Sequence, residues 1–194
     1  MSSILGLSFL VIGYLIIATF IVIERRLRQT PDAKKFETGE FDSGSTLLIG
    51  AAFGIGLMLP VVMLVVGIGG FSTNVGVGLL GLALMLGGFA LRVWAATTLG
   101  KYYTRTLLTS ENQKVVMTGP YARIRHPGYL GDLLLWSGFG LLSSNLIVAI
   151  VFPVMFVTIY LYRIGKEETM LAKGLGSDYV QYQRRTRKLI PFVY

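Results

Sequence analysis

Long apolar blocks dominate this chain and limit what it can fold into. A helix that crosses a bilayer needs about twenty mostly apolar residues, and three blocks reach that length: Ile4–Ile23, Leu47–Ile68 and Val75–Leu99. Charged residues make up 14% of the chain, against roughly a quarter in soluble domains. The pattern therefore predicts an integral membrane protein that crosses the bilayer several times.

Two shorter apolar blocks follow in the second half, Tyr129–Leu142 and Leu146–Tyr162. Together they are too long for one span, and the small polar residues 143–145 between them are typical of a turn. We therefore expect a tight helical hairpin, which brings the total to five transmembrane helices. The predicted fold class is all-α and integral to the membrane, with a cytoplasmic C-terminal region that binds a cofactor.

The basic residues predict the orientation of these spans. Loops rich in lysine and arginine stay on the cytoplasmic side of a membrane. The basic residues outside the spans fall into three groups, after the first, third and fifth blocks: Arg25, Arg26, Arg28, Lys34 and Lys35; Lys101, Arg105, Lys114, Arg123 and Arg125; Lys166, Lys173, Arg184, Arg185, Arg187 and Lys188. The intervening loops carry none, so we expect the N-terminus outside and the C-terminus in the cytoplasm.

The chain changes character near Gly100. Residues 1–99 hold the first three predicted spans, whose glycines suit close packing of the helices within the chain. A dimer face and a gap for a ligand's tail are the alternatives. Residues 100–194 hold a cytoplasmic loop, the hairpin and a helical tail that we expect to break at Gly174–Gly176, and they form the predicted catalytic half. The polar loop Asp32–Ser45 shows no recognisable chemistry.

Composition excludes several classes of site. The chain has no cysteine and a single histidine, which excludes thiolate chemistry and disfavours a histidine metal site. We therefore predict no metal. The net charge of +8 is accounted for by membrane topology, and no recognised nucleic-acid fold accompanies it. Nucleic acid is not an expected partner.

The unusual residues gather in one segment, Gly119–Gly131, which reads G-P-Y-A-R-I-R-H-P-G-Y-L-G. It carries the single histidine, His126, and Pro127 after it favours a helix start. The first-turn N–H groups would then form an anion pocket facing the cytoplasm. The alternatives are a histidine bonded to backbone, and tyrosines that anchor the chain at the interface.

Arg163 and Glu167 are four residues apart and share one helix face. They form either an ordinary helix ion pair or a functional pair, in which the arginine grips an anion and the glutamate binds a cation. Arg92 lies near one end of its span, where its side chain would reach the interface. Asp132 lies inside a span, which makes it a suspect for function, with Arg125 or a backbone group as its alternative partner.

The sequence lacks the motifs of two common kinds of enzyme site. There is no phosphate-binding glycine motif after a strand, and no legible serine–histidine–acid set. Methyl transfer from a sulfonium donor asks little of acid–base groups, because the enzyme chiefly aligns two bound partners.

Three motifs in order resemble the isoprenylcysteine carboxyl methyltransferase family. They are R-H-P-G-Y-L-G, then R-I-G-K-E-E, then G-S-D-Y-V-Q-Y-Q-R-R-T-R-K-L-I-P-F, within Lys101–Tyr194. The resemblance implies S-adenosylmethionine as cofactor and methyl transfer to the carboxylate of a lipophilic isoprenylcysteine-like substrate. That substrate, a small molecule or a prenylated peptide, would enter from the bilayer.

The resemblance also implies roles for individual residues. Arg163 would be the catalytic residue that binds and orients the substrate carboxylate, and Glu167 would meet the charged end of the donor. The remaining implied cofactor-binding residues are Gln113, Lys114, Val115, Val116, Tyr121, His126, Pro127, Gly128 and Tyr129.

Three other functions stay open on the sequence. One is methyl transfer to a phospholipid or another lipid. A second is an NADPH-dependent reductase of the sterol type, which Y-L-G-D-L resembles. A third is a small channel without catalytic activity, although no polar path across the spans is legible.

Overall fold

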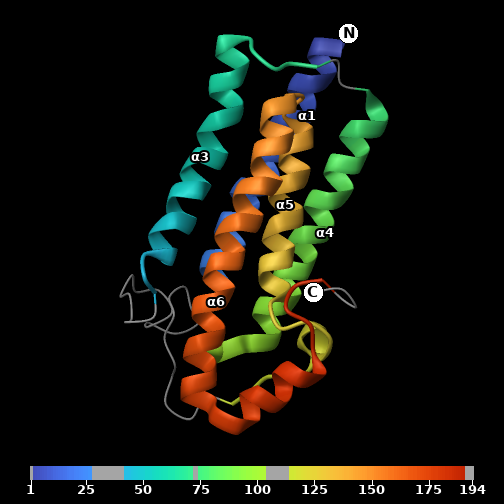
Figure 1. The fold of residues 1–194 in the computed structure, drawn as a ribbon. Coiled ribbons are helices and arrows are strands. Elements are labelled where there is room, and N and C mark those ends of the chain that lie inside the picture. The colour runs from blue at the N-terminus through green and yellow to red at the C-terminus, as the bar shows by residue number, and fades with distance from the viewer. Residues whose placement is uncertain (1, 28–41, 72–73, 104–113, 191–194) are drawn as a thin grey trace.

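The fold is a bundle of long helices, shown in Figure 1 for a computed structural model that describes residues 2–27, 42–71, 74–103 and 114–190. The helices are α1 (Ser2–Leu27), α3 (Ser45–Val66), α4 (Val75–Leu99), α5 (Pro127–Leu142) and α6 (Leu146–Arg185). Two short 3-10 helices accompany them, η1 (Gly100–Tyr102) and η2 (Gly119–Ala122). The all-α class is confirmed.

Within the described residues, four helices are long and apolar enough to cross a membrane: α1 from Ile4, α3, α4 and α6. Helix α5 has 16 residues, a rise of about 24 Å. It occupies the middle of the bundle, where it packs against α4 and α6 and also contacts α1. Helix α3 packs chiefly on α6.

Glycines bring α4 and α5 into backbone contact. A Cβ added to Gly88 would lie 2.5 Å from the amide nitrogen of Leu135, and one added to Gly131 would lie 2.7 Å from the carbonyl oxygen of Gly88. Gly81 and Gly138 repeat this approach two turns further along. The prediction that glycines allow close helix packing is confirmed at these positions. Gly87, by contrast, faces open space.

The predicted hairpin is present, and its turn is fixed by hydrogen bonds. The Asn145 side chain accepts from the amides of Ile147 and Val148 at 3.0 and 3.2 Å, which caps α6. It also donates to the carbonyl of Ile68 at 2.6 Å. The turn between α5 and α6 therefore lies against the turn between α3 and α4, at the end of the bundle near the N-terminus in Figure 1.

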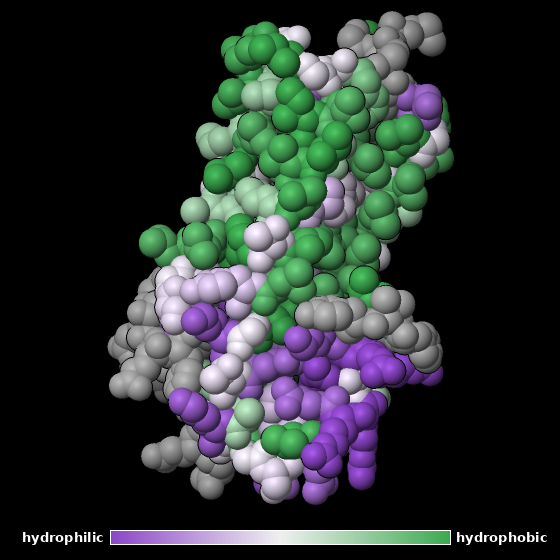
Figure 2. Space-filling view, viewed as in Figure 1, coloured by the Kyte–Doolittle hydropathy of each residue, from purple (hydrophilic) through white to green (hydrophobic). Residues whose placement is uncertain are grey.

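Helix α6 runs well past the predicted span. It continues to Arg185 and breaks at Gly176, whose φ of 57° and ψ of −134° are not helical, as the sequence predicts. Past this break the chain turns back under the bundle (Figure 1). In Figure 2, apolar residues cover the upper part of the visible face and polar residues gather at the lower end, beside this turned-back tail.

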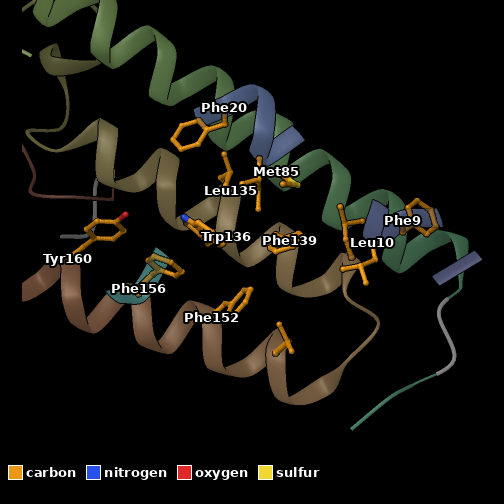
Figure 3. Close-up of a cluster of buried hydrophobic side chains, with 14 residues drawn as sticks. Phe9, Leu10, Phe20, Met85, Leu135, Trp136, Phe139, Phe152, Phe156 and Tyr160 are labelled. Carbon is orange, nitrogen blue, oxygen red and sulfur yellow. The ribbon is translucent and has the colours of Figure 1, made fainter. Parts of the chain in front are cut away.

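The core of the bundle combines aliphatic side chains with a set of aromatic rings that contact one another (Figure 3). Trp136 stacks on Phe156 with ring centroids 4.9 Å apart and meets Phe53 edge-on at 5.1 Å. Phe139 on α5 and Phe152 on α6 lie one turn from Trp136 and Phe156, towards the turn between the two helices, and are fully buried. These rings hold α3, α5 and α6 together.

Candidate active site

The segment Gly119–Gly131 forms a buried turn that leads into α5. Helix η2 buries Pro120 and Tyr121, and α5 begins at Pro127, as the sequence predicts. His126 precedes that helix and is 5% exposed. Its ring therefore lies inside the protein, beside Tyr129, with which it stacks at 5.6 Å.

The C-terminal tail is fastened to this segment by backbone hydrogen bonds. The amides of Arg125 and His126 donate to the carbonyls of Arg187 and Lys188 at 2.8 and 3.0 Å, and the amide of Arg187 donates to Arg123 at 3.1 Å. The Tyr182 hydroxyl donates to the carbonyl of Tyr121 at 2.7 Å. The tail thus closes the lower end of the bundle.

Arg125 strengthens the same closure with its side chain. Its guanidinium donates to a carboxylate oxygen of Glu168 at 2.7 Å and to the carbonyls of Gln183 and Thr186 at 3.1 and 2.5 Å. The same Glu168 oxygen lies 3.3 Å from Nε2 of His126. Glu168, the neighbour of Glu167 on α6, is a site residue that no sequence pattern had indicated.

Arg163 and Glu167 lie on one face of α6, with the Tyr129 hydroxyl between them. This hydroxyl donates to Oε2 of Glu167 at 2.6 Å and accepts from Nε of Arg163 at 3.4 Å. Nδ1 of His126 lies 3.9 Å from the same Glu167 oxygen. The predicted residues Arg163, Glu167, Tyr129 and His126 therefore meet in one cluster.

Asp42, which lies three residues before α3, completes this cluster, and no sequence pattern had marked it as a site residue. Its Oδ1 accepts a hydrogen bond from Nη1 of Arg163 at 2.5 Å. The hydroxyls of Ser45 and Thr46 also accept from Nη1, at 2.6 and 3.0 Å. The loop Asp32–Ser45, which showed no recognisable chemistry, thus contributes a buried partner, while residues 32–41 lie outside the described part.

The surroundings of Asp42 keep its carboxylate ionised. Burial alone would raise the pKa of this group. The hydroxyl and amide of Thr46, the hydroxyl of Ser45 and the charge of Arg163 outweigh burial, so the pKa of Asp42 lies below its ordinary value of 3.8.

A second polar cluster lies across the Tyr129 ring, which stacks on Tyr160 at 4.9 Å. The Tyr160 hydroxyl donates to Asp132 at 3.0 Å, and Arg92 approaches Asp132 at 3.4 Å and Glu24 at 2.9 Å. The Arg92 side chain, which the sequence predicts to reach the interface, is 14% exposed and pairs with these two carboxylates. Asp132 has Arg92 and Tyr160 beside it, whereas the expected Arg125 bonds to Glu168 and the tail.

Burial also governs the two tyrosines that border this region outside the spans. It raises the pKa of Tyr103 and of Tyr121 well above the ordinary value. Both hydroxyls therefore stay protonated at neutral pH. The Tyr103 hydroxyl donates to Glu24, and it cannot act there as an anion.

Both clusters face one cavity of about 400 Å³. Its lower part is polar and is closed by residues of α6 on both sides of the break at Gly176, among them Leu171, Leu175, Tyr179 and Tyr182. Its upper part is apolar and lies among α1, α3 and α5, with Ile17, Phe20, Ile49, Phe53, Leu57 and Trp136 on the wall. The cavity therefore joins a polar chamber to an apolar channel.

The predicted site residues fall mostly on this wall. Those that line the cavity are Lys114, Val115, Val116, Tyr121, His126, Gly128, Tyr129, Arg163 and Glu167. Pro127 is buried in the first turn of α5, where it begins the helix. Gln113 lies outside the described residues.

Comparison with known proteins assigns the family. The model of the isoprenylcysteine carboxyl methyltransferase family matches residues 79–173. Protein-S-isoprenylcysteine O-methyltransferase B of Arabidopsis thaliana is 32% identical over 155 residues, which cover 77% of this chain and 78% of that protein. The chain belongs to the isoprenylcysteine carboxyl methyltransferase family.

Two other matches cover less of the proteins compared. The structure of the eukaryotic intramembrane Ras methyltransferase of the family superposes with a TM-score of 0.58 at 23% identity, over 76% of this chain and 52% of that one. A cobalt-zinc-cadmium resistance protein of Cupriavidus metallidurans is 32% identical over 114 residues, or 59% of this chain and 47% of that protein. The chain thus spans about half the length of these two proteins, and the solved structure supports the intramembrane fold.

Members of this family are methyltransferases that use S-adenosylmethionine, and the residues present here suit that molecule. The carboxylate of Glu167, 25% exposed towards the cavity, matches a cationic group. The rings of Tyr121, His126 and Tyr129 give flat walls for a base and aromatic faces for a cation. A volume of about 400 Å³ falls within the usual range for ligand sites.

Proposed function

We propose that this chain transfers a methyl group from S-adenosylmethionine to the carboxylate of a lipophilic, isoprenylcysteine-like substrate. The observation that carries the proposal is a continuous cavity that joins the Glu167–Tyr129 cluster to an apolar channel between helices. A polar chamber alone would suit any nucleotide. Its connection to the channel suits a substrate with a charged head and an apolar tail.

The residues of the polar chamber would divide the work between two ligands. Glu167, held by the Tyr129 hydroxyl at 2.6 Å, would bind the positive end of S-adenosylmethionine, with Tyr121 and His126 along the wall. When bound, this molecule supplies a methyl group attached to a sulfonium sulfur. The neutral thioether that leaves needs no proton from an acid. Lys114, Val115 and Val116 would line its remaining length.

Arg163 would bind the substrate carboxylate and aim one oxygen at the methyl carbon. Methyl transfer would join that oxygen to the methyl carbon and break the sulfur–carbon bond, with the electron pair of that bond left on sulfur. The negative charge of the substrate and the sulfonium charge would cancel, so Arg163 and Glu167 would not have to transfer a proton. Arg163 and Glu167 therefore serve mainly to align two ligands, which can supply several kcal/mol of the barrier reduction.

The apolar channel would receive the substrate tail sideways from the bilayer. Ile21 of α1 and Gly50 of α3 line the cavity and are exposed, and α3 packs chiefly on α6. This leaves the side between α1 and α3 for entry. Burial of the tail would contribute about 0.8 kcal/mol for each CH₂ group.

The topology that follows has five spans, with α5 as the fourth. Residues 1–99 would form the part that admits the substrate, and residues 100–194 the catalytic half. The polar chamber and the tail would face the cytoplasm, where S-adenosylmethionine is made, and the N-terminus would lie outside. The distribution of lysine and arginine supports this orientation.

Calorimetry of the detergent-purified protein with S-adenosylhomocysteine, followed by methyl transfer to a farnesylcysteine analogue, tests the proposal. We expect binding and turnover. Binding without turnover on this analogue, but with turnover on phospholipid, would change the substrate to a lipid. Binding of NADPH in place of S-adenosylhomocysteine would refute the proposal in favour of a reductase, and binding of neither would refute it outright.

A further inference from the structure

The proposed function needs Arg163 and Glu167 to act on different ligands, although their positions favour neutralising each other. Residues four apart on a helix are neighbours, and opposite charges there attract. The Tyr129 hydroxyl already lies within 2.6 Å of Oε2 of Glu167 and 3.4 Å of Nε of Arg163. An arginine that turned fully towards Glu167 would occupy the carboxylate that the donor requires.

Asp42 holds the guanidinium from the other side. The contact between its Oδ1 and Nη1 of Arg163 measures 2.5 Å and spans 121 positions of the sequence. Both side chains are nearly inaccessible, with exposed fractions of 2% for Asp42 and 3% for Arg163. Water therefore weakens this attraction far less than it weakens a surface ion pair.

Asp42 is itself rigidly placed. The hydroxyl of Thr46 donates to Oδ1 at 2.6 Å, that of Ser45 donates to the same oxygen at 3.1 Å, and the amide of Thr46 donates to Oδ2 at 3.2 Å. The N-terminal end of α3 adds a favourable dipole for a carboxylate. Both hydroxyls also accept from Nη1 of Arg163, so they fix the position of the Asp42 carboxylate relative to the Arg163 guanidinium.

We propose that Asp42 is a positioning residue, which holds the Arg163 guanidinium apart from Glu167 so that Arg163 is left for the substrate carboxylate and Glu167 for the donor. This inference rests on the proposed function. It assigns a role in donor binding to a residue that lies across the cluster from Glu167, just before α3. A tie between α3 and α6 that served stability alone would have no such effect.

A double-mutant cycle on S-adenosylhomocysteine binding separates the two roles. Without Asp42, Arg163 turns to Glu167, so Asp42→Asn and Asp42→Ala should each raise the dissociation constant at least about fivefold. Arg163→Leu should leave that constant nearly unchanged while it lowers turnover. Adding Asp42→Ala to Arg163→Leu should then have no further effect on donor binding, because no arginine remains to block Glu167.

Asp178→Asn is the matched control, since Asp178 is an exposed acid in the tail that does not line the cavity. It should bind S-adenosylhomocysteine as the unmodified protein does. If Asp42→Ala does not fold, Asp42→Asn, which keeps the shape of the side chain, decides the question alone. The double variant removes both members of the Asp42–Arg163 ion pair together, so neither of these two charges is left buried without the other.

The outcomes are distinct. Loss of affinity in the Asp42 variants that disappears in the Arg163→Leu background supports the inference. Equal affinity in all the variants, or a loss of the same size in both backgrounds, refutes it and leaves the proposed function standing. If the unmodified protein binds no S-adenosylhomocysteine, the proposed function fails, and this inference fails with it.

Discussion

Gly88→Ala should loosen the contact between α4 and α5 and disturb the site that both helices carry. The new Cβ would lie 2.5 Å from the amide nitrogen of Leu135 and 2.9 Å from the Cβ of Leu134. The first of these atoms belongs to the backbone, so no side-chain rotation can relieve the clash. The two helices would have to separate by about 1 Å to restore ordinary contact.

The cost of this separation can be estimated. Overpacking of a close contact costs about 1–3 kcal/mol, which corresponds to a fall of roughly 3–10 °C in melting temperature for a chain of this size. Arg92 lies one turn beyond Gly88 and pairs with Asp132, which follows Gly131. Because a misplacement of about 1 Å can reduce turnover roughly a hundredfold, activity should fall more steeply than stability suggests.

Gly87→Ala is the matched control, because Gly87 is exposed and its added Cβ would meet open space. Alanine is a better helix former than glycine by up to about 1 kcal/mol, so this variant should melt at the same or a higher temperature. The measurements are thermal unfolding in detergent and methyl transfer to the farnesylcysteine analogue. Equal melting temperatures and turnover for the two variants would refute the argument from close packing.

Three further predictions concern the site and the orientation. Glu167→Gln should weaken S-adenosylhomocysteine binding by about tenfold, because a charged hydrogen bond is lost, and unchanged calorimetric affinity would contradict that role. The pKa of Asp42 is lowered in the folded protein, so the Asp42 carboxylate should stabilise the fold fully above the ordinary pKa of 3.8 and lose this effect as the pH falls further. The difference in melting temperature between the unmodified protein and Asp42→Asn should therefore shrink from pH 7 to about pH 3. A constant difference would show that the charge of Asp42 is not its source. Since the chain lacks cysteine, a membrane-impermeant maleimide should label Gly70→Cys in intact cells and Ser177→Cys only in opened ones, whereas the reverse pattern would invert the proposed topology.

The sequence predicted those parts of the fold that depend on local composition. Apolar block length located the long helices, the polar trio located the turn before Asn145, and the glycines near Gly176 located the break in α6. The common face of Arg163 and Glu167 follows from helical periodicity alone. Their meeting with His126 and Tyr129 was implied by the family resemblance, and the structure brings all four together.

What the sequence did not predict depends on tertiary contacts. Nothing local to Asp42 indicates a partner 121 positions away, and other acids, among them Glu37 and Glu40, precede it in the same loop. Arg92 has the sequence context of an interfacial arginine. It turns inwards because α1 and α5 place Glu24 and Asp132 beside it, and no single helix contains that information.

The shortness of α5 has a consequence for how a lipid substrate meets the enzyme. At about 24 Å, this helix falls short of a hydrocarbon layer of about 30 Å. Because the first turn of α5 carries Gly128 and Tyr129, the polar chamber would lie at the depth at which lipid headgroups meet the acyl chains. An amphiphile in the leaflet keeps its acid group near that depth, so under the proposed topology it would reach the chamber by moving sideways, without leaving the lipid.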